Sequence, residues 1–456
     1  MRERLAYWAG RLALALSRRL GRGGTSLPGR VALRVDPALL GKLARRCERG
    51  AVLVSGTNGK TTTARILAGA LERSEGAPVH NRSGANLPPG LVTAFLRTPP
   101  PWRRALLEVD EAALPRAAAQ VPAALLLVTN VFRDQLDRYG EVERTARLIE
   151  SGIRRLDPGA TVVLNADDPR VAAMAAAAPG RVRFFGFEAS VAASDAKGPL
   201  GDAGRCPRCA APLTFTARLY AHLGRYLCPG CGFRRPDPEV TIQGFTALPW
   251  GSRLEVAWAG GALAVELPLP GLFNAYNALG AAAAALALGV DAEVVGAALG
   301  AAVGSFGRFQ RVDAGERQLV VALVKNPTGF NEVLRTVEGI EGEKDMLFLL
   351  NDRAADGTDV SWLWDVDLER LSRPGAGIGA VTCGGERAGD MAVRLKYAGF
   401  ERPRLQFAQG VEAALDLALA RGSPGRPLVI MPTYTALLAL EDVLARRGVA
   451  RSFWEV

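Results

Sequence analysis

A strand, a short glycine-bounded loop and a helix start follow one another near the N-terminus, and this order constrains the fold more than any other feature. Residues 52–63 are Val-Leu-Val-Ser-Gly-Thr-Asn-Gly-Lys-Thr-Thr-Thr. Glycines allow backbone N–H groups to approach a phosphate, and the N-terminus of the following helix adds a positive dipole. Lys60 can reach terminal phosphates, and Thr61 or Thr62 can hold Mg²⁺. The pattern predicts a nucleotide-phosphate site at Gly56, Thr57, Asn58, Gly59, Lys60, Thr61 and Thr62.

The loop is shorter than a general P-loop. It has two residues between its glycines, where the general motif has four. The alternative interpretation is a plain strand-to-helix turn, but turn chemistry does not require Lys-Thr-Thr-Thr at the helix start. The shorter loop narrows the choice among nucleotide-binding families more than it weakens the prediction of a phosphate site.

Continuous apolar strands alternate with helical segments after this loop. We expect a helix from residue 62 to about 73 and strands at 105–109, 124–128 and 161–164. Such strands indicate a parallel sheet covered by helices on both faces. Each strand ends in polar residues, and ligands of open α/β sheets lie at the carboxyl ends of the strands. Glu108 and Asp110 are therefore candidate Mg²⁺ ligands, with a helix-capping role as the alternative.

Four of the six cysteines form a C-x₂-C-x₁₈-C-x₂-C pattern, made by Cys206, Cys209, Cys228 and Cys231. This is the spacing of two zinc knuckles that close a tetrahedral site, and four thiolates leave no position for water. The predicted zinc is therefore structural. Two disulfides are the alternative, although nothing else in the sequence indicates an oxidising compartment. Cys47 and Cys383 are interpreted as buried or incidental thiols.

Positive charge is concentrated at the N-terminus. The formal net charge is +10, and residues 1–50 hold twelve Lys and Arg against three acidic residues. This asymmetry argues against a nucleic-acid-binding surface spread over the whole protein. On a helical wheel an apolar arc lies beside an arc of arginines, and it consists of Leu5, Trp8, Leu12, Leu16 and Leu20.

This basic amphipathic helix leaves two interpretations open. It packs on the protein's own body, or it also touches an anionic membrane surface. Arginines interrupt it well before the ~20 apolar residues that a bilayer span needs, and no cleavage region of a secretory signal follows. We expect a cytoplasmic protein without a transmembrane segment, with peripheral contact to the inner face of the membrane as the finer possibility.

Changes of pattern divide the chain into three parts. The basic segment spans residues 1–48, and an ATP-binding domain spans 49–306 with a zinc ribbon inserted at 202–238. A C-terminal α/β domain spans 307–456, with strands expected at 319–324, 345–350, 378–382 and 427–431. The predicted fold class is thus α/β: a central ATPase domain with a parallel sheet and an inserted Cys₄ ribbon, followed by a second α/β domain.

Five motifs occur in the order seen in Mur ligases: Gly-Thr-Asn-Gly-Lys-Thr-Thr, Leu-Glu-Val-Asp-Glu, Asn165-Ala-Asp-Asp-Pro, Asn274-x-x-Asn277 and Gly307-Arg308-Phe309. The chain resembles this family over roughly residues 50–335. The resemblance implies ATP and Mg²⁺ as cofactors, with Glu108, Asn277 and Arg308 in the nucleotide site. It also implies that a substrate carboxylate is phosphorylated and that an amine attacks the acyl phosphate. Lys60 and the loop amides can supply the necessary charge stabilisation and alignment.

Several departures from the usual Mur ligase narrow the resemblance. The phosphate loop starts too early for a preceding uridine-diphosphate-binding domain, and the histidine that usually follows Thr-Asn is absent from residues 129–137. The cysteine insertion and an Asp-Gly-x-Asp-x-Ser-Trp segment are additional. These features resemble the synthetase subunit of lipid II isoglutaminyl synthase. That resemblance implies ATP-dependent amidation of the D-glutamate α-carboxylate of lipid II, in a heterodimer with a GatD-like glutaminase.

The sequence offers no glutamine-hydrolysing site of its own. Such a site normally needs a Cys nucleophile with a His base, and this chain has only His80 and His222. A second polypeptide or free ammonia must therefore supply the nitrogen. The resemblance implies that an Asp of the C-terminal domain completes the partner's Cys-His pair. The candidates are Asp356 first, Asp359 second and Asp352 as a further possibility, with an Asx-turn role as the alternative for each.

The segment at residues 325–331, Lys-Asn-Pro-Thr-Gly-Phe-Asn, resembles the start of the family's terminal domain, and we expect it to face the nucleotide or the acyl phosphate. Two other classes of function remain. One is a stand-alone Mur-type or folylpolyglutamate-type ligase that adds an amino acid. The other is a zinc-ribbon nucleic-acid-binding ATPase, which the interleaved arginines and tyrosines of the insertion favour slightly. We expect no nucleic-acid partner.

Overall fold

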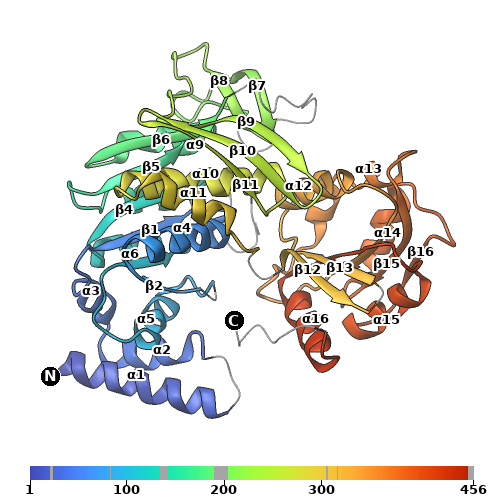
Figure 1. The fold of residues 1–456 in the computed structure, drawn as a ribbon, viewed down its shortest axis with the longest axis horizontal. Helices are drawn as coiled ribbons and strands as arrows, with labels where there is room; N and C mark the ends of the chain where they lie inside the picture. Colours follow the sequence, from blue (N-terminus) through green and yellow to red (C-terminus); the bar gives the residue numbers. More distant parts are fainter. Residues whose placement is uncertain are drawn as a thin grey trace.

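A computed structural model describes residues 1–20, 24–82, 84–133, 142–188, 204–304, 307–315 and 317–449. Two α/β units lie side by side, with helices of the N-terminal segment below the first unit and a small hairpin above it (Figure 1). The first unit is built on a nine-stranded sheet and the second on a six-stranded sheet. The predicted α/β fold class with two sheets is confirmed.

The N-terminal segment forms three helices, α1 (Arg2–Arg19), α2 (Leu27–Val35) and α3 (Leu39–Ala44). Helix α1 packs on the body through small residues, and its buried positions are Ala6, Gly10, Leu14 and Ser17. A Cβ atom on Gly10 would lie 2.6 Å from Leu96 Cδ1, so glycine permits this close approach.

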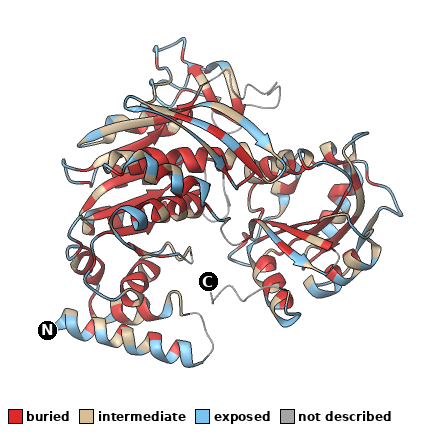
Figure 2. Cartoon of the chain, viewed as in Figure 1, coloured by how far each residue is buried: buried red, intermediate tan, exposed pale blue. Residues whose placement is uncertain are grey.

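The apolar arc of α1 does not make this contact. Its side chains remain 51–72% exposed and belong to Leu5, Trp8, Leu12, Leu16 and Leu20. The outer side of α1 is correspondingly exposed in Figure 2. The helix therefore packs on the protein, as one interpretation expected, with Ala6, Gly10, Leu14 and Ser17 inward and the apolar arc outward.

The nine-stranded sheet has the order β11-β10-β9-β6-β5-β4-β1-β3-β2. Its strands from β2 to β9 pair in parallel, and β9, β10 and β11 pair antiparallel at one edge. The bounds are β1 (Ala51–Ser55), β2 (Val79–His80), β3 (Ala105–Glu108), β4 (Ala123–Val128), β5 (Thr161–Asn165), β6 (Arg181–Phe187), β9 (Val240–Leu248), β10 (Gly251–Trp258) and β11 (Gly261–Leu267). The strands expected near 105, 124 and 161 are confirmed.

Helices cover both faces of this sheet, which explains why its central strands are continuously apolar. On one face lie the N-terminal helices with α5 (Pro88–Arg97), α6 (Leu114–Gln120) and α8 (Val142–Ile153). On the other face lie α4 (Lys60–Glu75), α10 (Leu272–Ala287) and α11 (Ala292–Gly300). Short turns of helix follow β5 as α9 (Pro169–Ala173) and η1 (Met174–Ala177). Alternate residues of β1 point to opposite faces, so each apolar side chain meets one of these two layers.

The inserted hairpin consists of β7 (Thr214–Tyr220) and β8 (Leu223–Leu227), which pair antiparallel. Its own small core contains Leu213, Tyr226 and Phe233 together with two of the cysteines. The hairpin packs against the end of α9, where Ala172 belongs to the same cluster.

The six-stranded sheet has the order β12-β13-β17-β14-β15-β16, parallel except for the β12–β13 pair. The strand bounds are β12 (Arg308–Ala314), β13 (Arg317–Ala322), β14 (Lys344–Leu349), β15 (Ile378–Gly384), β16 (Leu405–Phe407) and β17 (Leu428–Pro432). One face packs against α12 (Pro327–Glu338), η3 (Ser361–Asp365), α13 (Glu369–Ser372) and α14 (Ala388–Tyr397), the other against α15 (Val411–Arg421) and α16 (Tyr434–Arg446).

In the part of the chain that the structure describes, no helix combines the length and the apolar character that crossing a membrane would require.

Candidate nucleotide site and cysteine centre

The glycine loop joins the end of β1 to the start of α4 at the carboxyl edge of the sheet. Gly56 and Gly59 have φ angles of 121° and 84°, which favour glycine. A Cβ atom on Gly59 would lie 1.9 Å from Asn277 Oδ1, and one on Gly56 would lie 2.4 Å from Thr129 Oγ1. Both glycines are thus required by backbone conformation and by close neighbours. The predicted residue Asn277 is brought to the loop by the first turns of α10.

The end of β4 holds the loop in place. Asn130 accepts a hydrogen bond from the Asn58 backbone N–H at 2.9 Å and donates one to the Asn58 carbonyl at 3.1 Å. Thr129 Oγ1 donates to the same carbonyl at 2.8 Å. These bonds fix the loop before any ligand binds, so its backbone donors are preorganised.

Lys60 is buried at the centre of this site. Its Nζ donates to Glu111 Oε1 at 3.0 Å and to the loop carbonyls of Gly56 and Thr57. Burial by itself lowers the pKa of Lys60, but the carboxylates of Glu111, Glu108 and Asp110 outweigh it and raise that pKa. The lysine is therefore a fixed positive charge beside the loop, and Glu111 neutralises it in the absence of a phosphate.

The residues present fit an Mg²⁺ ion at the predicted carboxylate. Glu108 is buried, and only its Oε1 atom accepts a bond, from Asn86 Nδ2 at 3.3 Å. Glu108 Oε2 and Thr62 Oγ1 are buried without a hydrogen-bond partner in the described structure. A buried carboxylate oxygen without a donor is costly, and a cation would satisfy it. Glu108, with Thr61 or Thr62, can hold the ion, and Mg²⁺ there would neutralise phosphate charge.

Two residues of the C-terminal unit reach the loop. Lys325 Nζ donates to the Thr57 carbonyl at 3.3 Å, and Asn326 Nδ2 donates to Asn58 Oδ1 at 3.0 Å. This segment therefore lies against the glycine loop, and its position toward a nucleotide or an acyl phosphate stays a prediction. Phe309 joins the same cavity from β12, whereas the side chain of the predicted residue Arg308 lies outside the described part of the structure.

The cavity between the loop and the C-terminal unit is small. It has a volume of about 70 Å³, and its polar and aromatic lining includes Asn58, Asn130, Asn277, Phe273 and Phe309. Ligand pockets are usually at least ~300 Å³. A nucleotide therefore requires Lys325 and its neighbours to move away from the loop.

The four motif cysteines come together as predicted. Their Sγ atoms all lie within 4.8 Å of one another. Cys206 and Cys231 are 3.6 Å apart at sulfur, and Cys209 and Cys228 are 3.4 Å apart. Tetrahedral Zn–S bonds of about 2.3 Å place sulfurs roughly 3.8 Å apart, whereas a disulfide requires about 2.05 Å. The geometry fits a Cys₄ zinc ion and disagrees with two disulfides.

The ribbon is tied to the nucleotide-binding sheet by buried polar contacts. Asp167, at the end of β5, accepts bonds from Tyr276 at 2.7 Å and from Arg235 of the insertion. Asp168 caps α9 and accepts the Val131 backbone N–H at 2.8 Å, and the ring of His222 lies 3.4 Å from it. His222 is completely buried. Its position indicates a structural role at the ribbon base, away from solvent.

The candidate aspartates of the C-terminal unit have different surroundings. Asp356 is 5% exposed and accepts bonds from the backbone N–H and hydroxyl of Thr435. Burial raises the pKa of Asp356 despite these bonds. Asp359 is exposed, and Ser361 lowers its pKa by donating two hydrogen bonds. Asp352 accepts a bond from Arg387 at 2.7 Å.

Sequence reasoning missed the role of Glu111, the ion-pair partner of Lys60. It follows the Glu-Val-Asp strand end directly, and only the turn after β3 brings its carboxylate back to the loop. A buried lysine requires a partner, so an acid at one of the neighbouring strand ends was the available clue.

Comparison with known proteins agrees with this site. Residues 54–199 match the family described as Mur ligase middle domain, and residues 323–437 match the family described as MurT ligase C-terminal. MurF from Acinetobacter baumannii superposes with a TM-score of 0.68 at 19% identity, covering 91% of this chain and 80% of that one. Folylpolyglutamate synthase from Mycobacterium tuberculosis, solved with ADP and AMPPCP, gives 0.60 at 17% identity, with 91% and 93% covered. Fold and site define a Mur-type, ATP-dependent ligase.

Two relatives share almost the whole length. Lipid II isoglutaminyl synthase (glutamine-hydrolyzing) subunit MurT from Streptococcus pneumoniae R6 is 34% identical over 459 residues, covering 99% of both chains. The same subunit from Staphylococcus aureus COL is 34% identical over 448 residues, covering 98% of both. The chain belongs to the MurT family of Mur ligases.

Proposed function

We propose that this chain uses ATP to amidate the α-carboxylate of D-glutamate in the lipid II stem peptide, through an acyl phosphate, to D-isoglutamine. The observation that carries the proposal is the buried Lys60 beside preorganised loop amides and a carboxylate with an unpartnered oxygen. The two full-length relatives named for this reaction support the choice of substrate.

The chain's own residues account for the charge changes that this reaction needs. ATP phosphates at the loop would compete with Glu111 for Lys60. The positive charge of Lys60 would then stabilise the negative charge on the phosphoryl group during its transfer. Lys325 lies beside the same loop on the opposite unit. Closure of the C-terminal unit would bring this second cation to the acyl phosphate and exclude water that would hydrolyse it.

We propose that the nitrogen comes from a glutaminase subunit that binds the C-terminal unit. Asp356 is the proposed third member of that subunit's Cys-His pair, because a carboxylate held by two hydrogen bonds suits the orienting role in a triad. Nearby lie two exposed aromatic residues and an exposed valine, which we call the aromatic patch. They are Trp364, Tyr397 and Val393, and they are 49–72% exposed. Exposed aromatic side chains are typical anchors of protein interfaces. A hollow of about 610 Å³ beside Asp359 and Trp364 offers room for a partner's side chains.

Two further assignments complete the proposal. Zinc is the proposed occupant of the Cys₄ centre, where it would stabilise the ribbon. We also propose that the exposed apolar arc of α1 lies on an anionic bilayer surface. Exposed arginines on the same helix, including Arg4, Arg18 and Arg19, complement the charge of such a surface. The protein would then bind its lipid-linked substrate at the membrane surface, where the lipid anchors that substrate.

The direct test is amidation of lipid II by the purified two-subunit complex with ATP, measured by mass spectrometry that separates carboxyl from carboxamide. Glutamine and ammonia are supplied in separate reactions. We expect Lys60→Ala to lower turnover at least 100-fold with either nitrogen source, while the exposed control Arg116→Ala keeps it. Normal turnover by Lys60→Ala would contradict the loop assignment. A product in which an amino acid, instead of ammonia, has been joined to the substrate would favour the stand-alone ligase.

A further inference from the structure

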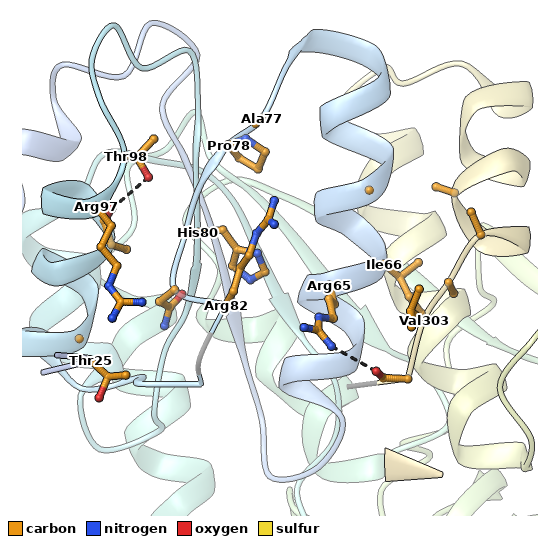
Figure 3. A pocket seen from close by; sticks show the side chains of 18 of the residues that line it. Thr25, Arg65, Ile66, Ala77, Pro78, His80, Arg82, Arg97, Thr98 and Val303 are labelled. Atoms are coloured by element: carbon orange, nitrogen blue, oxygen red, sulfur yellow. Dashed lines mark hydrogen bonds between the residues drawn. The ribbon is translucent and has the colours of Figure 1, made fainter. Parts of the chain in front are cut away.

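A cavity of about 680 Å³ lies beside α4, away from the glycine loop. Four arginines line it: Arg65 and Arg73 from α4, Arg82 after β2, and Arg97 at the end of α5. We call this space the arginine cavity. Figure 3 shows Arg97 and Arg65 extending from helices on opposite sides, with His80 and Arg82 between them. The cavity is within the size range of ligand pockets.

Positive charge in the arginine cavity exceeds negative charge. Among its described lining residues Glu441 is the only carboxylate, and burial raises the pKa of Glu441 to about 7. Glu441 is therefore only about half ionised near pH 7. Arg82 pairs with Glu72 only at 3.7 Å, with both side chains more than half exposed. Such an exposed pair contributes little.

Arg65 is repelled by Arg82 within the cavity, and Arg97 is repelled by Arg18 of α1, which is not a lining residue. Burial and then the charge of Arg82 lower the pKa of Arg65, and burial and then the charge of Arg18 lower that of Arg97. Guanidinium groups nevertheless stay protonated in proteins. An anion in the cavity would relieve this repulsion.

His80 adds a neutral donor or acceptor to the same wall. Burial, followed by the charges of Arg82 and Arg65, lowers the pKa of His80 to about 3. Its Nδ1 atom is buried and has no hydrogen-bond partner in the described structure. An unpartnered buried N–H is costly, so in the tautomer with hydrogen on Nδ1 this atom would donate to an oxygen of a bound anion.

The position of the cavity suits an extended substrate. Arg65 follows Lys60 by five residues on α4, which places it about 7.5 Å further along the helix axis. On the other side, Arg11 of α1 donates to the carbonyl of Leu96, next to Arg97. The arginine cavity therefore lies between the phosphate loop and the helix that carries the exposed apolar arc.

We propose that the arginine cavity binds a diphosphate group, and that this is the diphosphate that joins the substrate's sugar to its lipid. The second part rests on the proposed function. Several guanidinium groups match the multiple charges and acceptor oxygens of a diphosphate. A single carboxylate would leave most of the positive charge unbalanced. Bound here, the substrate would extend along α4 toward Lys60 while its lipid runs toward α1.

Binding of inorganic pyrophosphate, measured by calorimetry without Mg²⁺, tests the site independently of activity. The full-length Lys60→Ala chain is used, so that the glycine loop lacks its lysine. We expect saturable binding that weakens at least tenfold in the added double variant Arg82→Gln/Arg97→Gln. The control Arg116→Gln/Arg253→Gln removes the same charge from exposed sites elsewhere. Equal affinity of the two double variants, or no saturable binding at all, would overturn the proposal.

The exposed Arg82→Gln single variant guards against a folding defect at Arg97. The Arg82→Gln variant should still weaken pyrophosphate binding with an unchanged melting temperature, and unaltered affinity would count against the site.

A kinetic experiment identifies the source of the diphosphate. In the complex, Arg82→Gln should raise KM for the lipid-linked substrate and spare KM for a phosphate-free muramyl peptide. An equal rise for both would refute the assignment to the lipid diphosphate. Absence of amidation would contradict the proposed function while leaving the calorimetric result valid.

Discussion

At the scale of single residues, the charged side chains of both the glycine loop and the C-terminal unit already have partners within the chain. Lys60 is paired with Glu111, and Asp356 is held by Thr435. Such pairing keeps each side chain in one orientation before its ligand arrives, which is the structural basis of preorganisation. It also means that each ligand must replace an existing interaction.

The two aspartates can be separated by isosteric substitution. We expect Asp356→Asn to lower glutamine-dependent amidation by about 100-fold or more while sparing the ammonia-dependent reaction, because only glutamine hydrolysis needs the triad. Asp359→Asn is the matched control, three residues away, and should change neither rate by more than about twofold. Both rates are measured on the assembled complex. If Asp359→Asn alone gave the selective loss, the role would pass to Asp359.

At the scale of elements, the cysteine spacing correctly predicted that the four thiols of the ribbon meet. The helical periodicity of α1 did not predict which face of that helix is buried. The ribbon's cysteines are close because two tight turns and a hairpin bring the pairs together, and both features are local in sequence. The inward face of α1 depends on contacts with α2, the next helix along the chain, and with α5, which is distant in sequence.

A closed zinc site contributes folding energy directly. Cys209→Ser should therefore lower the melting temperature by several degrees and reduce the bound zinc to near zero, as measured by scanning calorimetry and elemental analysis. Cys383→Ser is the control, because this buried cysteine lies in β15, far from the ribbon. Full zinc content in Cys209→Ser would contradict a four-cysteine site.

Helix α1 should bind lipid through its exposed arc. Leu12→Glu is expected to weaken binding to anionic vesicles about tenfold or more, because a buried leucine contributes roughly 1.5–3 kcal/mol. Co-sedimentation with phosphatidylglycerol vesicles measures the effect. Phe407→Glu carries the same charge change to an exposed apolar residue on β16 and should bind like the unaltered chain. Equal binding by both variants would show that α1 is not the contact.

At the scale of the whole molecule, two units meet over the glycine loop. The contacts from Lys325 and Asn326 close a cavity that is too small for a nucleotide. We expect the two units to open for ATP and to close again for chemistry. The aromatic patch lies on η3 and α14 of the C-terminal unit, the unit that we propose binds the glutaminase subunit.

Loss of the aromatic patch should separate the subunits. We expect Trp364→Ala to weaken assembly with the glutaminase subunit by at least tenfold, as measured by sedimentation or calorimetry, because aromatic anchors dominate interface energies. Phe407→Ala truncates another exposed aromatic residue and should leave assembly intact. Ammonia-dependent turnover of Trp364→Ala should persist, and undiminished assembly would move the interface elsewhere.

The sequence alone predicted the phosphate loop, the Cys₄ pattern and the order of the five motifs along the chain, because each depends on local conformation and fixed spacing. Gly56, Lys60 and the cysteines could be assigned without a structure. Tertiary structure alone decided that Glu111 pairs with Lys60 and that the apolar arc of α1 faces outward. It also gathered arginines from three separate elements around one cavity. Periodicity defines the faces of an element, but only packing against distant residues selects the face that is buried.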